Sequence, residues 1–567
     1  MASMKKKLLL LILSLLIPFT YNLYAKVTER VYLQTDKQLY IAGELIWLKI
    51  YTTDTEGKLQ DFSKVGYVEL LSDSDPKIQI KLEIKDGVGV GWMELPAIFE
   101  SGNYRLSAYT RYMRNEGEGV FFEKTIMIIN PLQKSNSTES IQSVRTPVNE
   151  TSPTNTTQLT VSKNLFEKRD KGIITITGLP EEYASLAVSI AGEAPFSPEN
   201  NSITLWKNNL TQPIHSSIET TFSPEYEGMI ISSQLMNNNT NTPSSFQNAD
   251  VMLSFPGKEV QVYSGQSEGN GIYNFYTQEI SGKHELTTTV FPDDDNSYRL
   301  DLLSPFSSHS SRQLPLPKLD STWRDYLSIR NLSSQVIRAY TTDSMNHIYT
   351  TSFNGLVPFR QYVLDDYTRF QNIEEIFIEF IWPARIRKIN DSRIFSVISD
   401  MNGNFSINYV LVLLDNIPIV NHELICKYNA LLVERIDIYQ GRHLYGGQLY
   451  GGIIHFVTHK GNYPDITFED YTQLFDFEGT QPYRYFYSPS YERDDGHTRM
   501  PDFRHTLLWE PLINSNGGKS IAIPFYTSDI PGKYTIKVEG ISTEGKIIDA
   551  TLQIEVTDLS AIEPAKQ

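Results

Sequence analysis

Apolar and polar residues alternate with a period of two through most of this chain, and this alternation constrains the fold more than any other feature. In residues 26–132 it runs through RVYLQTD, LIWLKIY, GYVELL, VGWMEL and YRLSAYTRY, with turn residues between the segments. Such a pattern predicts half-buried strands, and short strands at close, regular spacing are typical of β-sandwiches. We therefore expect a mostly β protein of tandem, immunoglobulin-like β-sandwiches.

Two segments of different composition interrupt this pattern. Residues 134–158 have no aromatic residue and are rich in Ser, Thr, Asn and Pro, which predicts a flexible linker. SHSSRQLPLPKLDS, with its prolines, predicts a second linker. Strand patterns resume after the first linker as LTVSKN, GIITITGL and SLAVSIAG, and they continue from EYEGMIISSQLM to HELTTTVF before the second linker. They return in the tail, from TLLWEPLI to DATLQIEV.

One α+β unit, residues 341–465, stands among these β segments. LDDYTRFQNIEEIFIEF, at 364–380, has its apolar residues at helical spacing and predicts a helix whose polar face carries Glu374 and Glu375. A strand, YVLVLLDNIPIV, a short helix, ICKYNALLVE, and the strands RIDIYQG and GGIIHFVT follow. The stretch 441–461 contains six glycines. Glycines spaced in this way suit sharp turns and close backbone approach.

The N-terminus has the pattern of a secretory signal. Lys5 to Lys7 precede an apolar run, Leu8 to Ile17, and Ala25 is a plausible cleavage position. The alternative is an uncleaved anchor, although the run is short for a membrane span. The only cysteine, Cys426, is far from the signal, so we expect neither a lipid anchor there nor a disulfide within the chain. The net charge of −17 argues against nucleic acid as a partner.

The histidines and acidic residues give no pattern of a metal site. His455 and His459 are four apart on a predicted strand, about 13 Å from each other, so we expect solvent-facing or turn histidines. PDDDNS, from residue 292, has several carboxylates that suit calcium but lacks the rest of an EF-hand loop, and we interpret it as a hairpin turn. We expect no metal ion and no cofactor.

The residues likewise give no pattern of a catalytic site. GQSEG at 265–269 matches G-x-S-x-G, yet its setting predicts strand-turn-strand and not the strand-turn-helix of a nucleophile elbow. The glycines after GRHLY open no helix and precede no Lys-Ser/Thr pair, so a phosphate-binding loop is not predicted. We expect no enzyme activity.

The α+β unit resembles the plug domain of TonB-dependent outer-membrane receptors. The family pattern, an apolar strand with a vDGvP turn, then IEsIEVlrG, then GvInIiTkkG, stands here as LVLLDNIPI, ALLVERIDIYQG and LYGGQLYGGIIHFVTHKG. Asn416 stands where glycine is usual, and His455 where asparagine or serine is common. Asparagine tolerates the left-handed backbone that glycine would supply, so the turn can survive. About 106 residues follow residue 461, so we expect a plug without its own barrel.

The plug resemblance singles out five residues as candidate turn or interaction positions. In the turn these are Asp415 and Asn416, and in the glycine-rich stretch, where a Cβ would block close approach, they are Gly446, Gly447 and Gly451.

The N-terminal region resembles the macroglobulin-like (MG2) domain, through VYLQTDKQLYIAGELIWLKIY and SGNYRLSAYTRYM. More divergent segments resemble a second such domain, a carboxypeptidase-regulatory-like sandwich and a C-terminal macroglobulin-like segment. In this order they resemble the macroglobulin-plus-plug proteins of the Bacteroidota cell envelope. The expected domains are a signal peptide (1–25), the MG2 sandwich (26–132), a linker (133–158), the second macroglobulin-like segment (159–220), the regulatory-like sandwich (221–305), a linker (306–340), the plug-like domain (341–465) and the C-terminal sandwich (466–567).

These resemblances imply a secreted, non-enzymatic scaffold at the periplasm or outer membrane, without a transmembrane helix in the mature chain. Its plug-like unit would engage a barrel or another envelope protein in trans. One alternative is a macroglobulin that interacts with proteases; thioester capture is excluded, since no GEQ follows Cys426. Another is glycan or peptide capture, for which the tyrosine-rich run PYRYFYSPSYE at 482–492 is suited. That run, which leads into RMPDFR, is also predicted to dock one domain against another.

Overall fold

The computed structural model describes most of the chain beyond the N-terminal segment. The predicted signal peptide lies outside the described residues, and so does nearly all of the 133–158 linker. The described residues are 28–133, 157–194, 202–212, 221–246, 249–291, 297–315, 323–340, 356–389, 392–398, 405, 409–445, 448–492 and 501–558.

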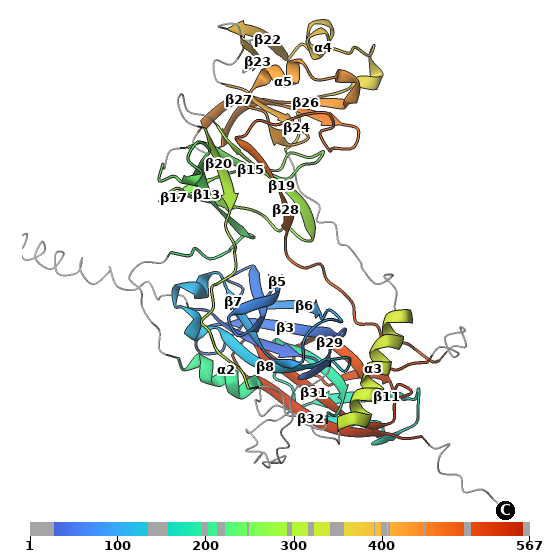
Figure 1. Ribbon diagram of the computed structural model, residues 1–567. Coiled ribbons are helices and arrows are strands. Elements are labelled where there is room, and N and C mark those ends of the chain that lie inside the picture. The colour runs from blue at the N-terminus through green and yellow to red at the C-terminus, as the bar shows by residue number, and fades with distance from the viewer. Residues whose placement is uncertain are drawn as a thin grey trace, which may run out of the picture.

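The molecule is elongated and has two units, which Figure 1 shows one above the other. The lower unit contains two β-sandwiches. The upper unit contains a smaller sandwich and, at its far end, an α+β domain. The fold is mostly β, as the alternating sequence predicts, with several separate sheets.

The first sandwich is formed by one eight-stranded sheet that folds over, in the order β1-β3-β6-β5-β4-β7-β8-β2. Strand β5 is shared, because it pairs with β4 along most of its length and with β6 at its end. Inward side chains such as Leu33, Ile50 and Leu106 are fully buried in the core. The strands are β1 (Arg30–Thr35), β2 (Leu39–Ile41), β3 (Leu45–Thr53), β4 (Val65–Ser72), β5 (Asp75–Lys85), β6 (Val88–Glu94), β7 (Gly102–Thr110) and β8 (Phe122–Ile129).

The second sandwich of the lower unit is composite, because two distant parts of the chain build it. Strand β12 lies between β29 and β31 and pairs with both. The segments that we predicted as two sandwiches, at 159–220 and 466–567, thus share one. Both edges of β12 are hydrogen-bonded to strands of the C-terminal region, so neither segment forms a complete sheet without the other. Its strands are β9 (Gln158–Val161), β10 (Leu165–Phe166), β11 (Lys171–Thr177), β12 (Ala184–Gly192), β29 (Thr506–Ser515), β30 (Ile521–Tyr526), β31 (Gly532–Ser542) and β32 (Ile547–Val556).

The upper sandwich has one sheet with β14, β13, β18, β17 and β20 and another with β16, β15, β19 and β28. Strand β28, which we assigned to the C-terminal sandwich, instead pairs with β19 over seven residues. The α+β domain is therefore an insertion between β20 and β28. The strands are β13 (Ile230–Asn237), β14 (Thr242–Pro243), β15 (Val251–Ser254), β16 (Val262–Ser264), β17 (Gln266–Gly269), β18 (Ile272–Tyr276), β19 (Lys283–Val290), β20 (Tyr298–Leu302) and β28 (Thr472–Glu478).

The α+β domain has a five-stranded sheet in the order β21-β26-β27-β24-β25, and a separate hairpin of β22 and β23. One face of the sheet packs against the helices and the hairpin through residues such as Phe377, Phe395 and Phe456. The other face packs on the upper sandwich. The elements are β21 (Arg360–Val363), α4 (Ile373–Glu379), β22 (Ala384–Ile389), β23 (Ser392–Val397), β24 (Leu411–Leu414), β25 (Ile417–Pro418), α5 (His422–Cys426), β26 (Val433–Tyr445) and β27 (Gln448–Thr458).

The predicted helix over 364–380 is wrong in its first half. Residues 364–366 form a single 3-10 turn, and α4 begins only at Ile373. Asn372 ends the extended segment, because its side chain accepts the backbone N–H of Glu374 at 2.9 Å and caps the helix. The Tyr367 ring stacks on Phe380, with 4.2 Å between ring centroids. Both rings are thus packed together without a continuous helix between them.

The predicted 306–340 linker contains ordered structure. Helix α3 (Trp323–Tyr340) buries Trp323 against the first sandwich, and Arg330 forms a 2.5 Å ion pair with Glu44. Before it, residues 303–315 run along the first sandwich as a strap. The N–H of Ser307 donates to the Tyr109 hydroxyl at 2.7 Å, and His309 lies 2.8 Å from the Glu69 carboxylate. Helix α2 (Ser202–Leu210) also packs on this sandwich.

A second strap, residues 480–492, returns from the upper unit to the composite sandwich. The Arg484 guanidinium lies 4.7 Å from the ring centroid of Trp92, and Phe486 packs edge-on against Trp47 at 5.6 Å. Tyr491 then donates its hydroxyl proton to Asp502 at 2.7 Å. The prediction that this aromatic run docks one domain against another is confirmed.

Candidate interaction surface

The Asp415–Asn416 turn joins β24 to β25, and both residues are fully buried. Their φ angles, 44° and 73°, lie in the left-handed region that the sequence predicts for this turn. The Asp415 carboxylate accepts the backbone N–H and the hydroxyl of Thr458, at 2.7 and 2.5 Å, and the N–H of Tyr463 at 2.5 Å. The aspartate therefore ties the turn to the end of β27.

Asn416 ties the same turn to the upper sandwich. Its Nδ2 donates to the carbonyls of Phe255 at 2.6 Å and Gln261 at 2.9 Å. Its Oδ1 accepts the N–H of Gln261 at 2.9 Å. All three bonds reach the loop between β15 and β16, which we call the clasp loop (residues 255–261). This predicted interaction turn is thus occupied by another domain of its own chain.

Ion pairs and apolar contacts extend this junction, which we call the joint. Lys258 of the clasp loop pairs with Glu434 on β26, and Arg435 donates to the Lys258 carbonyl at 2.8 Å. Apolar residues meet beside them: Met252, Val260 and Val262 from the sandwich, with Leu411, Leu413, Tyr439, Tyr450 and Ile453 from the α+β domain. The joint is therefore a packed interface and not a flexible link.

The predicted glycines fall into two groups. Gly446 and Gly447 lie outside the described residues. Gly451 is buried on β27, and its N–H donates to the Tyr409 carbonyl at 2.8 Å. At the adjacent Gly452, a Cβ would stand 2.8 Å from the Cβ of Val397, so glycine is required there for close packing. The glycine-rich stretch therefore has a packing role in the part that the structure describes.

His455 is fully buried in the joint, so our prediction of a solvent-facing or turn histidine is wrong for it. Its Nε2 accepts the N–H of Asn416 at 2.9 Å. Burial, with a smaller contribution from the positive charge of Arg435, lowers its pKa to about 3. His459 follows the end of β27 in a turn and is exposed, as predicted. The two histidines therefore share no site.

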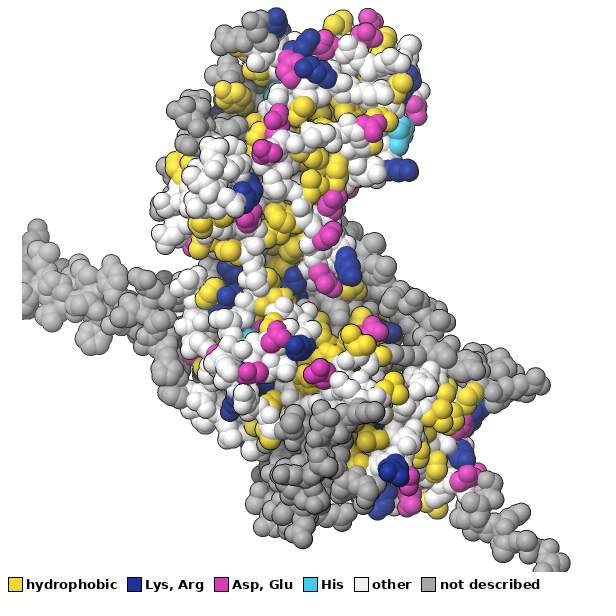
Figure 2. Space-filling view, viewed as in Figure 1, with side chains coloured by type: hydrophobic (Ala, Val, Ile, Leu, Met, Phe, Trp, Pro, Cys, Tyr) yellow, Lys and Arg dark blue, Asp and Glu magenta, His cyan; other side chains and the backbone are white. Residues whose placement is uncertain are grey.

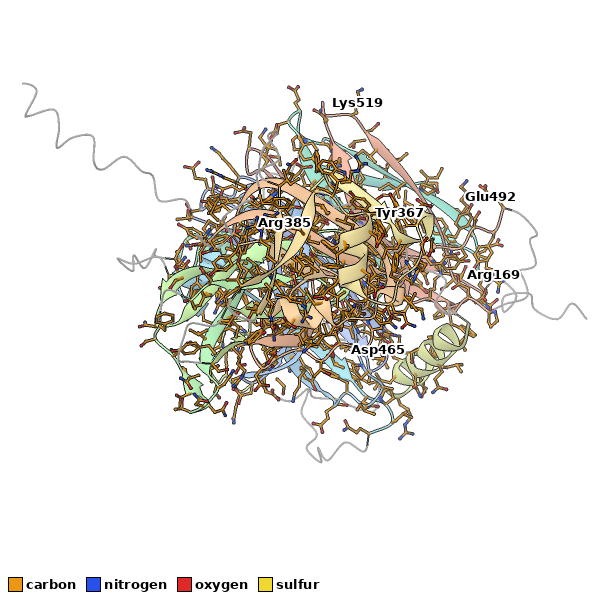
Figure 3. All side chains as sticks on the ribbon, turned by 90° about the horizontal axis from the view of Figure 1, so that it is seen from above. Arg169, Tyr367, Arg385, Asp465, Glu492 and Lys519 are labelled. Atoms are coloured by element: carbon orange, nitrogen blue, oxygen red, sulfur yellow. The ribbon has the colours of Figure 1, made fainter. Side chains whose placement is uncertain are left out.

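A different part of the α+β domain is open to solvent and apolar. Val357, Phe359, Tyr367, Ile378 and Trp382 expose between 41% and 89% of their surface, and we call this set the apical surface. Phe359 and Trp382 meet edge-on at 6.4 Å. It lies at the far end of the upper unit, around α4 and β21, where Figure 3 views the molecule end-on and labels Tyr367.

Arginine accompanies these apolar side chains. The Arg360 guanidinium lies 5.9 Å from the ring centroid of Trp382 and 6.0 Å from that of Tyr362. Arg385, on β22, is exposed and is also labelled in Figure 3, but its guanidinium lies over Phe405, 3.5 Å from the ring centroid. Acidic side chains are interspersed with basic ones over the upper unit, as Figure 2 shows, so no single charge dominates the visible face.

Our sequence analysis missed Ile378 and Trp382. A signal was present for the first, since Ile378 lies off the helical face that Ile373, Ile376 and Phe377 bury. An isoleucine at an exposed helix position has no folding role to explain it, and its side chain is 80% exposed here.

Other candidate sites offer fewer functional side chains. A cleft of about 190 Å³ lies between the first and upper sandwiches, lined by Val65, Ile84, Met229 and Ile280 with charged residues that include Glu83, Lys85 and Glu279. Ser267 of the G-x-S-x-G match lies on β17 with β18 following, the strand-turn-strand setting that we predicted. The acidic residues after Pro292 lie outside the described residues.

The described residues contain neither a metal-binding group nor a membrane-spanning helix. No group of three or more His, Cys, Asp and Glu side chains is placed to hold a metal ion. Within the same residues, the helices lack the combination of length and apolar character that crossing a bilayer requires.

No protein-family model and no curated protein sequence matches this chain. Alignable solved structures include Salmonella alpha-2-macroglobulin reacted with methylamine, at 8% identity and TM-score 0.24, covering 93% of this chain and 39% of that one. Escherichia coli alpha-2-macroglobulin activated by porcine elastase gives 8% identity and TM-score 0.24, covering 93% and 44%. Dimeric latent PorU from Porphyromonas gingivalis gives 10% identity and TM-score 0.13, covering 93% and 34%. The chain spans less than half the length of each, and scores this low assign no function.

Proposed function

We propose that this protein is a non-enzymatic scaffold of the cell envelope, whose α+β domain engages an outer-membrane barrel or another envelope protein in trans. The observation that carries the proposal is the apical surface. Single exposed apolar residues are ordinary on soluble proteins, but several large apolar side chains exposed within residues 357–382, with Phe359 and Trp382 in direct contact, are typical of a protein contact.

The composition of the apical surface fits a protein partner. Trp, Tyr and Arg are the residues that contribute most to binding energy at interfaces. Here Arg360 lies against Trp382 and Tyr362, and Tyr362 in turn packs against Tyr367. Phe359 and Ile378 would surround them and exclude water. Because the charges nearby are mixed, we expect apolar burial to supply the affinity, with little dependence on salt.

The test is affinity purification of the tagged protein from solubilised envelopes, comparing wild type with the double variant Ile378→Ser and Trp382→Ser. Ile378 is 80% exposed, so its replacement should change the free energy of unfolding by less than about 0.5 kcal/mol. Trp382 is 55% exposed and packs on Phe359, so the urea midpoint of the double variant is compared with that of wild type before the capture. We expect an envelope protein that co-purifies with wild type and is lost with the double variant. Ile98→Ser is the matched control, because Ile98 is 86% exposed on the first sandwich.

A point variant is preferable to deleting residues 341–465. Strand β28 follows the α+β domain and completes the upper sandwich, so a deletion risks unfolding both. Capture of the same partner by the wild type and the double variant would refute the apical surface as its binding site. Proteases captured equally by all three proteins would favour a macroglobulin-type role instead.

A further inference from the structure

His455 lies at the centre of the joint between the α+β domain and the upper sandwich. On β27, Ile454 and Phe456 point to the face covered by helices, whereas Ile453 points to the upper sandwich. Side chains alternate along a strand, so His455 shares the face of Ile453. Its cross-strand neighbours on that face are Leu413 on β24 and Asp437 on β26.

The hydrogen bond of His455 requires a neutral imidazole. Nε2 faces the backbone N–H of Asn416, so Nε2 is the acceptor and the proton is on Nδ1. Nδ1 has no hydrogen-bond partner among the described residues. An imidazolium has two donors and no acceptor. Protonation would therefore set an N–H of His455 against the N–H of Asn416.

The charged groups around His455 do not favour its cation. Arg435, on β26, is positive and opposes a second charge. Asp437 already accepts from Arg435 at 3.0 Å and Gln361 at 2.9 Å.

The remaining charged groups are also engaged. The Asp415 carboxylate is held by Thr458 and Tyr463. From the clasp loop, Lys258 pairs with Glu434, and Glu259 lies 3.6 Å from Arg435.

We propose that the joint is an acid-sensitive latch, in which protonation of His455 at Nε2 displaces the Asn416 turn and releases the α+β domain from the clasp loop. The open joint exposes His455 to water, where an imidazole takes up a proton below about pH 6.5. The closed joint holds it neutral. Because only the open state gains the proton over this range, opening becomes more favourable as pH falls.

The reporters are the amide protons of Gly257 and Gln261, which donate across the joint to the Asp415 carbonyl and to Asn416 Oδ1. Hydrogen exchange of the full chain is measured from pH 6.5 to 5.0 and corrected for intrinsic exchange. In wild type we expect the opening constant to rise about tenfold per pH unit below about 6.5. The buried strand β7 of the first sandwich should show no such rise, which distinguishes local opening from unfolding.

His455→Gln offers an uncharged acceptor in place of Nε2, and we expect its opening constant to stay within about twofold over this range. His455→Asn is run beside it in case glutamine does not fit. His284→Gln is the control for a histidine beside the joint: His284 is exposed on β19, and its ring packs edge-on against Phe255 of the clasp loop at 5.8 Å. It should keep the wild-type profile, and a flat profile would assign the pH response to His284 and overturn His455 as the latch residue.

A wild-type profile that is flat, or a His455→Gln profile as steep as wild type, would overturn the latch. If neither His455 variant folds, the wild-type profile of Gly257 and Gln261 relative to β7 decides alone. The latch makes no use of the apical surface, so it stands or falls independently of the proposed function.

Discussion

Replacing Asn416 by alanine should open the joint more than any other single change at this interface. The substitution removes three hydrogen bonds to the clasp loop, one buried and two partly buried, between 2.6 and 2.9 Å. At about 0.5–1.5 kcal/mol each, they contribute roughly 3 kcal/mol together. Alanine must also adopt the φ of 73° that asparagine tolerates, which costs about 1 kcal/mol more. We expect the free energy of joint opening to fall by about 4 kcal/mol.

Asn416→Gly separates the two contributions. Glycine, the usual residue of the plug pattern at this position, adopts the left-handed backbone without strain but makes none of the side-chain bonds. It should therefore retain about 1 kcal/mol of stability relative to alanine. If glycine and alanine are equally destabilising, the backbone argument is wrong.

The assay is hydrogen exchange at pH 7, where His455 is neutral in all variants. The free energy of opening is read from the Gln261 amide, which loses its acceptor in both variants, and from Gly257, which keeps its own. Gly257 is the stricter reporter, because it loses protection only if the turn moves. A change below about 1 kcal/mol at Gly257 in Asn416→Ala would refute the clasp as the interaction that holds the joint.

Three further predictions concern the rest of the molecule. Burial lowers the pKa of His422 to about 4 and that of His505 well below 6.5, so the unfolded chain binds more protons than the folded chain below pH 6.5. The free energy of unfolding should therefore fall with acid, by up to about 1.4 kcal/mol per pH unit for each histidine. Urea midpoints from pH 7.5 to 4.5 check this. Lys49→Met should destabilise the protein by about 2–4 kcal/mol. Buried Lys49 donates to oxygens of Ser185, Leu186 and Pro511, and its loss leaves these oxygens unpaired. An unchanged urea midpoint would contradict this. Cys426 is buried, and burial raises its pKa to about 12. A thiol reagent at pH 8 should therefore label the unfolded chain but not the native one. Fast labelling of the native chain would show that α5 opens.

The strands of this protein were predictable because their information is local. Period-two alternation identifies β1, β3, β4, β6 and β7, and the tail strands, without reference to any partner. Strand partners were not predictable in the same way. The strand at 184–192 is apolar on one face and has only small residues (Ser185, Ala187, Ser189) on the other, which indicates a central position, and it is buried on both faces. Nothing in its sequence specifies neighbours at 506–556 rather than nearer ones. The composite sandwich was therefore missed.

For the candidate sites, too, local features were predictable and long-range partners were not. The Asp415–Asn416 turn was predictable, since few residues accept a left-handed backbone, whereas its partner loop at 255–261 has no sequence signal of its own. His455 carried a signal that we misread. A single polar residue within GGIIHFVT must either face solvent or satisfy a buried partner, and the apolar residues on both sides of it favour burial. The alternation of apolar and polar residues could not distinguish a solvent-facing His455 from a buried one, because both faces of this sheet are covered.

Covered faces also determine where the α+β domain can meet another protein. One face of its sheet is occupied by α4, α5 and the β22–β23 hairpin, and the other by the upper sandwich, so neither is open to a partner. The turn that the plug resemblance identifies is used within the chain. Large apolar side chains that face solvent in this domain include Ile378 and Trp382, on the outside of α4 and beside β21, and, at other positions, Ile389, Tyr409 and Leu444. If a partner binds the apical surface as proposed, the Asp415–Asn416 turn makes no contact with it, and substitutions in that turn should change its affinity only by opening the joint.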